Sequence, residues 1–262
     1  MPRGRTNPVM VTRIRGGERS RMPDKVIVEE PMEIRLDDHL VATTMRTPGH
    51  DYELAVGFLF GEGMLGGFNV HEVRYCATGP AVDTGFNIVS VSTHGKAPVP
   101  EPRLGTTSSS CGLCGSTTID EVAARLEPFA AATPLDAGVV LDVAERVRKA
   151  QELFAATGGV HAAAAFSLAD GDVELVREDV GRHNAVDKVV GHLHLARELP
   201  ARRLGLFVSG RVSFEIVQKA WAAGFSVVVG VSAPTALAIE TAHRANLTLA
   251  GFVRDDGLNL YT

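Results

Sequence analysis

The chain is poor in cysteine, in tryptophan and in long apolar runs. It has three cysteines and one tryptophan among 262 residues. Three cysteines in a chain of this length do not make a disulfide framework, which favours a reducing, cytoplasmic setting. No apolar run approaches the roughly 20 residues that a membrane helix needs, and the first residues lack the apolar region of a secretory signal. We therefore expect neither a disulfide scaffold nor a membrane protein.

The remaining composition is typical of a globular protein. Hydrophobic residues make up 45% of the chain and charged residues 22%. The formal net charge of −5 gives no indication of a nucleic-acid partner. The length is sufficient for one large domain or two small ones with a buried core.

The N-terminal part carries strand patterns and one helix pattern. Residues 1–25 contain six arginines, and we expect a partly disordered basic tail that leads into an edge strand at Met10–Ile14. Alternating apolar residues on both sides of the turn at Asp37 and Asp38 predict a β-hairpin. The pattern then predicts a helix that starts near Asp51 and ends at 61–63, and strands at 74–77 and 86–91.

From residue 118 onward the pattern changes to strands and helices in alternation. Continuous apolar strands between helices are typical of a largely parallel sheet covered on both faces, so we expect an α/β fold for this part. The expected helices are 118–126, 141–156, 184–196, 213–223 and 235–245. The expected strands are 162–168 and its hairpin partner 173–177, followed by 204–209, 226–232 and 248–254.

Two cysteines lie two residues apart in a segment rich in glycine and serine. Thr118 and Glu121 predict a capping box just after this Cys111-x-x-Cys114 pair, so Cys114 would lie near the positive end of a helix, where a thiol loses its proton more easily. A zinc site lacks a second pair of ligands, and a dithiol redox site lacks a thioredoxin-like context. The residues leave zinc binding, redox chemistry, persulfide transfer and an inert pair open. Cys76 lies in a strand pattern and is expected to be buried.

A run of charged residues at Arg177–Lys188 opens a predicted helix. His183 or Asn184 could cap that helix, and Arg182 and Lys188 could reach an anion. The alternative is a capped helix start that faces solvent. The run contains only two apolar anchors, both valines, so its polar groups need partners.

Two strand-to-helix turns place backbone N–H groups and hydroxyls where a phosphate binds well. The first turn holds Ser209, Gly210 and Arg211, and the second holds Pro234 and Thr235. Neither is a recognised nucleotide motif, and ordinary turns are the alternative.

The last strand ends in the segment Phe252–Gly257, where Phe252 could stack on a purine. Asp255 or Asp256 could accept hydrogen bonds from guanine, and a surface turn is the alternative. Zinc nucleobase deaminases use H-x-E and a later P-C-x-x-C, but the residues after His161 lack the glutamate and Pro234–Ala238 lacks both cysteines. We hypothesise a deaminase-like topology without zinc, in which His161 is either a pocket residue or a core histidine.

In this order the motifs resemble the FdhD family, the sulfurtransferases required for active formate dehydrogenase. The resemblance runs from about Val11 to Tyr261. It depends on Met45–Asp51, on the serine-rich loop with Cys111 and Cys114, on Thr157–His161, on Glu178–Lys188 and on Ser209–Arg211.

The resemblance implies a cytidine-deaminase-like, three-layer α/β C-terminal domain with a smaller, strand-rich α+β N-terminal domain. The expected division is 9–105, a mobile C-x-x-C loop at 106–117, and 118–262. The family pairs as a dimer, so a cytoplasmic homodimer is expected.

The resemblance also implies a persulfide intermediate. Cys111 would accept sulfur from a cysteine desulfurase with the assistance of Cys114. The sulfur would pass to the molybdenum (or tungsten) bis-molybdopterin guanine dinucleotide cofactor of formate dehydrogenase, for which a guanine nucleotide is expected to substitute. Basic residues would help to hold the diphosphates. The predicted cofactor-binding residues are His161, Arg182, His183, Lys188, Ser209, Gly210, Arg211, Phe252, Val253, Arg254, Asp255, Asp256 and Gly257.

Two other functions compete with sulfur transfer. The first is a chaperone that binds the molybdenum cofactor and delivers it without transferring sulfur. The second is a structural zinc module, which predicts stoichiometric metal in the purified protein. We predict no metal site.

Overall fold

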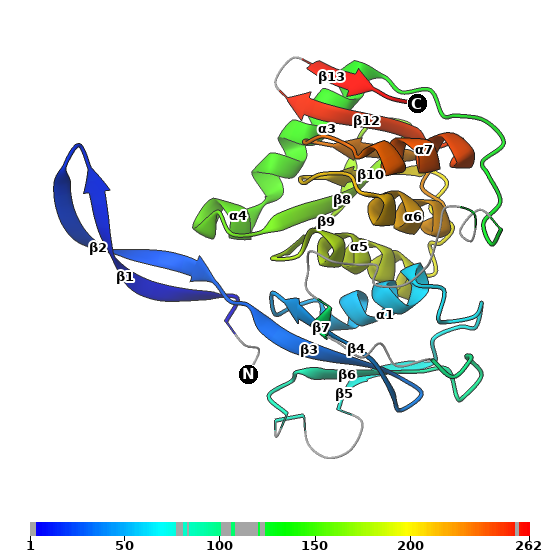
Figure 1. Cartoon of the computed structure of the whole chain (residues 1–262), viewed down its shortest axis with the longest axis horizontal. Coiled ribbons are helices and arrows are strands. Elements are labelled where there is room, and N and C mark those ends of the chain that lie inside the picture. The colour runs from blue at the N-terminus through cyan, green and yellow to red at the C-terminus, as the bar shows by residue number, and fades with distance from the viewer. Residues whose placement is uncertain are drawn as a thin grey trace.

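The computed structural model describes residues 4–76, 81–82, 84–100, 106–107, 120, 124–254 and 257–262. Figure 1 shows a body of strands and helices from which a two-stranded arm projects. The helices of this part are α1 (Asp51–Gly61), α3 (Ala137–Ala150), α4 (Glu152–Thr157), α5 (Arg182–Ala196), α6 (Phe214–Ala223) and α7 (Ala236–Ala245). No helix among them is long and apolar enough to cross a membrane.

The larger sheet has six strands in the order β13-β12-β11-β10-β8-β9. Only β10, β11 and β12 are mutually parallel, and the other pairs are antiparallel. The expectation of a largely parallel sheet is therefore wrong, because hairpin connections at both edges reverse the chain. The strands are β8 (His161–Ser167), β9 (Val173–Asp179), β10 (Leu204–Val208), β11 (Val227–Gly230), β12 (Thr248–Arg254) and β13 (Gly257–Leu260).

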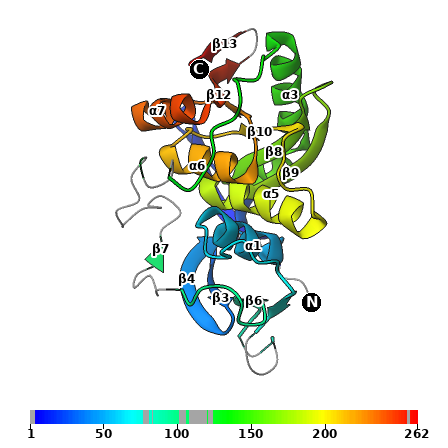
Figure 2. The ribbon, with the colours of Figure 1, turned by 90° about the vertical axis from the view of Figure 1, so that its right-hand side faces the viewer.

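Helices cover both faces of this sheet, α3 on one and α5, α6 and α7 on the other (Figure 2). In β10, Phe207 packs with the residues of α3, whereas Leu204 and Leu206 pack with those of the other three helices. Successive side chains of a strand point to opposite faces. The central strands are apolar on both faces for this reason, as the sequence predicted.

The smaller sheet has the order β5-β6-β3-β4-β7, and α1 packs between it and α5. The predicted hairpin is present as β3 and β4, with Asp37 and Asp38 at φ 45° and 68° in the turn. The strands are β3 (Glu30–Leu36), β4 (His39–Arg46), β5 (Glu72–Tyr75), β6 (Ile88–Ser92) and β7 (Thr106–Thr107).

The arm is an antiparallel ribbon of β1 (Thr6–Arg15) and β2 (Glu18–Ile27). The two strands pair along their whole length and turn at Gly16 and Gly17, which have φ 57° and 84°. Positive φ at both turn residues is the geometry of a tight hairpin turn and favours glycine. The expectation of a partly disordered tail with a short edge strand is therefore wrong, because the Gly16-Gly17 turn folds this segment back on itself as a hairpin.

The helix expected at 141–156 is instead two helices. Asp136 caps α3 by accepting a hydrogen bond from the backbone N–H of Val139, so the helix begins earlier than expected. The helix is interrupted at Gln151, which ends α3 and precedes α4. The carboxylate of Glu178 accepts hydrogen bonds from the backbone N–H groups of Leu153 and Phe154 at 2.9 and 2.8 Å. Glu178, which is distant in the sequence, therefore caps α4 as a separate helix, and the helix expected at 141–156 is interrupted.

Candidate functional site

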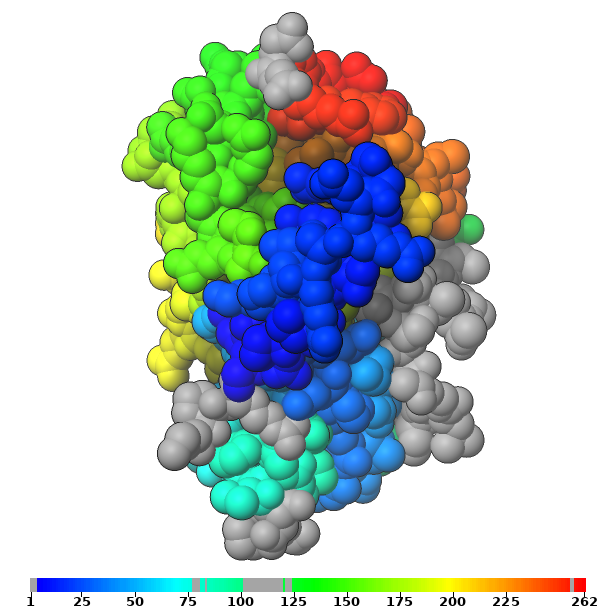
Figure 3. Space-filling view, turned by 90° about the vertical axis from the view of Figure 1, so that its left-hand side faces the viewer, coloured from blue at the N-terminus to red at the C-terminus, as the bar shows by residue number. Residues whose placement is uncertain are grey.

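The carboxyl ends of β10, β11 and β12 meet at one edge of the large sheet, where α5, α6 and α7 begin. Open α/β sheets bind ligands at this edge, because helix N-termini and loops converge there. Figure 3 looks at this side of the molecule, with the arm in front and a hollow beside it between the green residues of α3 and the red end of the chain. Most of the predicted cofactor-binding residues lie around this edge.

His161, Arg182 and Gly210 come together at this edge. A Cβ atom on Gly210 would lie 3.3 Å from Nδ1 of His161 and 3.5 Å from Cδ of Arg182, so glycine lets these side chains close over the turn. Burial, followed by the neighbouring Arg182 cation, lowers the pKa of His161 and favours its neutral form. The hydroxyl of Ser209 accepts a hydrogen bond from the backbone N–H of Ala162 at 2.9 Å, which fixes the turn to β8.

His183 links the starts of α5 and α6. Its Nε2 atom lies 3.0 Å from the hydroxyl of Ser213 and 3.0 Å from a carboxylate oxygen of Glu215. The predicted capping role of His183 or Asn184 is wrong, because Gly181 is the N-cap of α5 and both residues lie inside the helix. Ser213, the N-cap of α6, makes no capping bond with its side chain. The N-termini of both helices, with the positive ends of their dipoles, therefore lie at this edge.

The segment at the end of β12 contains a bulge. Phe252 has φ 54° and is 40% exposed, and the register with β13 shifts between Gly251 and Arg254. Bulges often re-aim a side chain next to a functional site. Arg254 is exposed as well, whereas Val253 is buried in the core that contacts α3 and does not face the edge. Asp255 and Asp256 lie outside the described residues.

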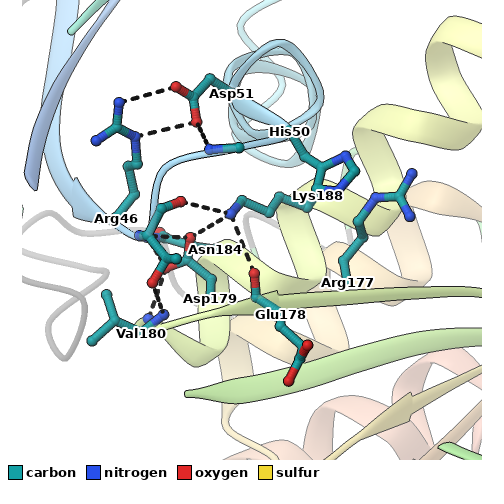
Figure 4. Close-up of polar contacts among 12 residues, drawn as sticks. Arg46, His50, Asp51, Arg177, Glu178, Asp179, Val180, Asn184 and Lys188 are labelled. Carbon is teal, nitrogen blue, oxygen red and sulfur yellow. Dashed lines mark hydrogen bonds and ion pairs between the residues drawn. The ribbon is translucent and has the colours of Figure 1, made fainter. Parts of the chain in front are cut away.

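Lys188 is part of the protein interior and not of the sheet edge. Its side chain is fully buried, and Nζ lies 2.7 Å from the carboxylate of Asp179, which is also fully buried. The ammonium also donates to the carbonyl oxygens of Thr47 and Glu178 at 3.0 and 3.3 Å (Figure 4). The structure therefore does not place Lys188 where a ligand at the edge would meet it.

Asp179 joins two of the sequence motifs. Its carboxylate accepts hydrogen bonds from the backbone N–H groups of Thr47 and Gly181 at 3.1 and 2.8 Å. It also accepts from the side-chain amide of Asn184 at 2.9 Å, and that amide donates to the carbonyl oxygen of Met45 at 2.8 Å. Residues 45–51 and 178–188 thus form one buried polar network between the two sheets (Figure 4).

Arg46 and Asp51 close the other side of this network. The guanidinium of Arg46, 1% exposed, makes two hydrogen bonds to Asp51 at 3.2 and 3.0 Å and one to Glu30 at 3.2 Å. The hydroxyl of Tyr75 donates to Asp51 at 3.3 Å, and burial together with this carboxylate raises the pKa of Tyr75. Each buried charge here has an opposite charge within hydrogen-bonding distance, as burial requires.

Glu53 of α1 is the centre of a second cluster of charged side chains. Its carboxylate contacts the guanidinium of Arg177 at 2.5 and 2.8 Å, and ring nitrogens of His192 and His50 at 3.0 and 3.3 Å. Burial alone would raise the pKa of Glu53, but the hydrogen bonds from these three groups outweigh it and lower the pKa.

A third buried pair lies between α5 and α6. The ammonium of Lys219 is 2.7 Å from the carboxylate of Asp187 and 3.7 Å from that of Glu62. Burial raises the pKa of Asp187 to about 6 in spite of the neighbouring ammonium. Arg46, Asp51, Glu53, Asp187 and Lys219 were not predicted as a network. The only signal was the polar run at 177–188, which had too few apolar anchors for a helix facing solvent.

The cysteine pair lies outside the described residues, and so does the predicted capping box at Thr118. β7, which pairs with β4, ends four residues before Cys111 in the sequence. Cys76 is buried, as predicted, with its sulfur 2.9 Å from the hydroxyl of Thr84. Among the residues that the structure describes, no group of three or more His, Cys, Asp or Glu side chains could hold a metal ion.

A model of the FdhD/NarQ family matches residues 27–262. The chain belongs to this family. The FdhD/NarQ match includes both motifs of the buried network and the whole sheet edge.

Individual relatives agree with the FdhD/NarQ assignment. The chain is 44% identical to "Sulfur carrier protein FdhD" of Mycolicibacterium paratuberculosis over 96% of this chain and 95% of the relative. It is 45% identical to the protein of the same name from Streptomyces coelicolor, over 96% and 92%. A crystal structure described as a formate dehydrogenase accessory protein from Desulfotalea psychrophila has a TM-score of 0.76, 24% identity, and coverage of 99% of this chain and 97% of that one. That likeness supports the mixed α/β fold.

Proposed function

We propose that this protein is a sulfurtransferase that carries a persulfide on Cys111 and delivers the sulfur for formate dehydrogenase maturation. The observation that carries the proposal is the 44% identity to a sulfur carrier protein over almost the whole chain, in a sequence that contains the Cys111-x-x-Cys114 pair. A lone thiol pair with glycine and serine around it suits a reactive role better than a packing role.

The first step is an exchange with a cysteine desulfurase. The Cys111 thiolate attacks the outer sulfur of the persulfide on the desulfurase, a new S–S bond forms on Cys111, and the cysteine of the donor leaves as a thiolate. No oxidant is needed, because one S–S bond replaces another. The thiolate of Cys111 is the form that reacts. Cys114 assists by receiving, holding or releasing the sulfur.

The acceptor is the molybdenum bis-molybdopterin guanine dinucleotide cofactor, treated as a substrate. The sheet edge has the chemistry for a dinucleotide: Arg182, Arg211 and Arg254 supply cations, and Phe252 offers an exposed ring. The N-termini of α5 and α6 lie at this edge, and the positive end of a helix dipole favours a phosphate. The glycine at position 210 lets His161 and Arg182 pack against the turn, where both could contact a phosphate. A guanine nucleotide would bind at the same edge.

The topology adds support for a deaminase-like domain at 118–262. Parallel strands β10 to β12, with helices on both faces of a mixed sheet, are compatible with that fold. We also propose a cytoplasmic homodimer, and the exposed Met10 and Ile14 of the arm, 56% and 61% exposed, offer apolar surface for a contact. Light scattering of the purified protein tests the oligomeric state.

Mass spectrometry of the intact protein tests sulfur transfer. After incubation with a cysteine desulfurase and cysteine, we expect a reducible gain of one sulfur that maps to Cys111 and is absent from Cys111→Ala. No gain on Cys111 or Cys114 with an active desulfurase would overturn the proposal. It would leave the cofactor chaperone, which predicts that Cys111→Ala still activates formate dehydrogenase.

A further inference from the structure

An apolar pocket of about 240 Å³ opens where α1, α5 and α6 end side by side, on the end of the molecule that faces the viewer in Figure 2. Phe60, Leu65 and Leu126 line it. The ring of His194 lies against Phe60, with 5.3 Å between ring centroids, and burial lowers the pKa of His194 so that the imidazole is neutral at pH 7. The pocket therefore suits a large apolar group.

The carboxylate of Glu62 is the acidic group on the wall of this pocket. It lies 3.7 Å from the buried ammonium of Lys219, so its charge is compensated from within the protein. Arg125 lines the same pocket. An anchor side chain entering the pocket would thus meet apolar surface with a balanced charge at one wall.

A second depression, of about 300 Å³, adjoins the first one. It shares Gly67, Phe68 and Asn69 with the apolar pocket, so Phe68, which is 42% exposed, stands between the two. Its other walls carry two cationic side chains, Lys96 and Arg197, and two histidines, His71 and His94. The rings of His71 and His94 lie 3.7 Å apart between centroids.

We propose that the two depressions form one docking surface for the sulfur donor, which would insert a large apolar side chain beside a group of carboxylates. This inference rests on the proposed function. An apolar anchor in a pocket supplies most of the affinity of such a contact, and complementary charge at the rim sets orientation and association rate. A small anion would bind only in the basic depression, and a purely apolar ligand would bind only in the apolar pocket, so neither would use the whole surface.

The position of the surface favours the donor over the acceptor. The sheet edge with Arg182 and Arg211 lies at the opposite ends of α5 and α6. A donor on this surface would leave the edge accessible to the nucleotide groups of the acceptor.

Isothermal titration of the purified protein with a purified cysteine desulfurase tests the surface. We expect Phe68→Ala and Lys96→Glu each to weaken binding by about tenfold. Phe154→Ala on α4 and Arg148→Glu on α3 are matched controls, because both side chains are exposed far from the surface, and they should bind as wild type does. Ala222→Trp fills the apolar pocket and should abolish binding, with circular dichroism as the check on folding.

Sulfur loading of Cys111 is measured separately, so the two proposals fail in different ways. Wild-type affinity in both Phe68→Ala and Lys96→Glu, or no binding of the desulfurase at all, would overturn the docking surface. Binding that depends on Phe68 and Lys96 without any sulfur on Cys111 would support the surface and overturn the transfer step.

Discussion

Gly57 of α1 and Gly191 of α5 let the two helices pack backbone against backbone. A Cβ atom on Gly57 would lie 1.9 Å from the carbonyl oxygen of Asp187, and one on Gly191 would lie 1.8 Å from that of Glu53. Neither contact can be relieved by moving a flexible side chain. The close approach packs α1, the helix of the small sheet, directly against α5 of the large sheet.

The change Gly191→Ala should therefore separate α1 from α5. We expect a loss of about 3 kcal/mol or more in the free energy of unfolding, measured by urea denaturation, since the methyl group overpacks a backbone contact. Gly138→Ala in α3 is the control, because its added Cβ would meet only the side chain of Asp136 at 3.2 Å. Equal stability of the two variants would contradict the close packing.

The buried pair of Asp179 and Lys188 gives a second prediction. Asp179→Asn leaves the Lys188 ammonium without its counter-charge, which should cost about 3–5 kcal/mol. The double variant Asp179→Asn, Lys188→Met removes both charges and should recover part of this loss in urea denaturation. If the losses in the free energy of unfolding of Asp179→Asn and Lys188→Met simply add in the double variant, the two charges are not coupled.

The lowered pKa of Glu53 predicts how stability depends on pH. A carboxylate whose folded pKa is below its usual 4.5 stabilises the protein above that pH, and the contribution is lost as the pH falls toward the folded value. Thermal unfolding should show Glu53→Gln less stable than wild type at about pH 7, with a smaller difference at about pH 3. Glu145→Gln, in an exposed pair on α3, should match wild type at both values.

The sheet edge predicts which arginine binds a nucleotide. Arg211→Ala should weaken binding of guanosine diphosphate by about tenfold, since a charge-assisted contact to a phosphate is lost. Arg148→Ala on α3 removes an exposed arginine from another face and should leave the dissociation constant unchanged. Equal dissociation constants for Arg211→Ala and wild type in equilibrium titration would place the nucleotide elsewhere.

Elements with a local signal could be predicted from the sequence. The helices α5, α6 and α7 begin within two residues of expectation, and Asp37 and Asp38 turn the predicted hairpin. Local patterns could not predict α4, because its cap is the carboxylate of Glu178, 25 residues from Leu153 in sequence. They also could not predict that β8 runs antiparallel to β10, since strand direction depends on how the chain returns to the sheet.

The site was predicted in part for the same reason. His161, Arg182 and Gly210 were each selected from separate motifs, and the structure brings them together. Lys188 carries the same charge as Arg182 and stands in the same run, yet its side chain is buried against Asp179. Which of two cations faces a ligand depends on the helical turn it occupies and on the segment that packs over it. The local sequence pattern does not show which distant segment packs over a residue.

The buried network has a consequence for synthesis on the ribosome. Thr47 emerges 132 residues before Asp179, the residue that accepts its backbone hydrogen bond. Lys188, which donates to the carbonyl oxygen of Thr47, appears later still. The backbone of Thr47 has these hydrogen-bond partners only after residues 178–188 have been synthesised. We therefore expect folding to finish only after most of the chain has been translated. Contacts so distant in sequence also make folding slow, and the exposed intermediate would then be a natural client for a chaperone.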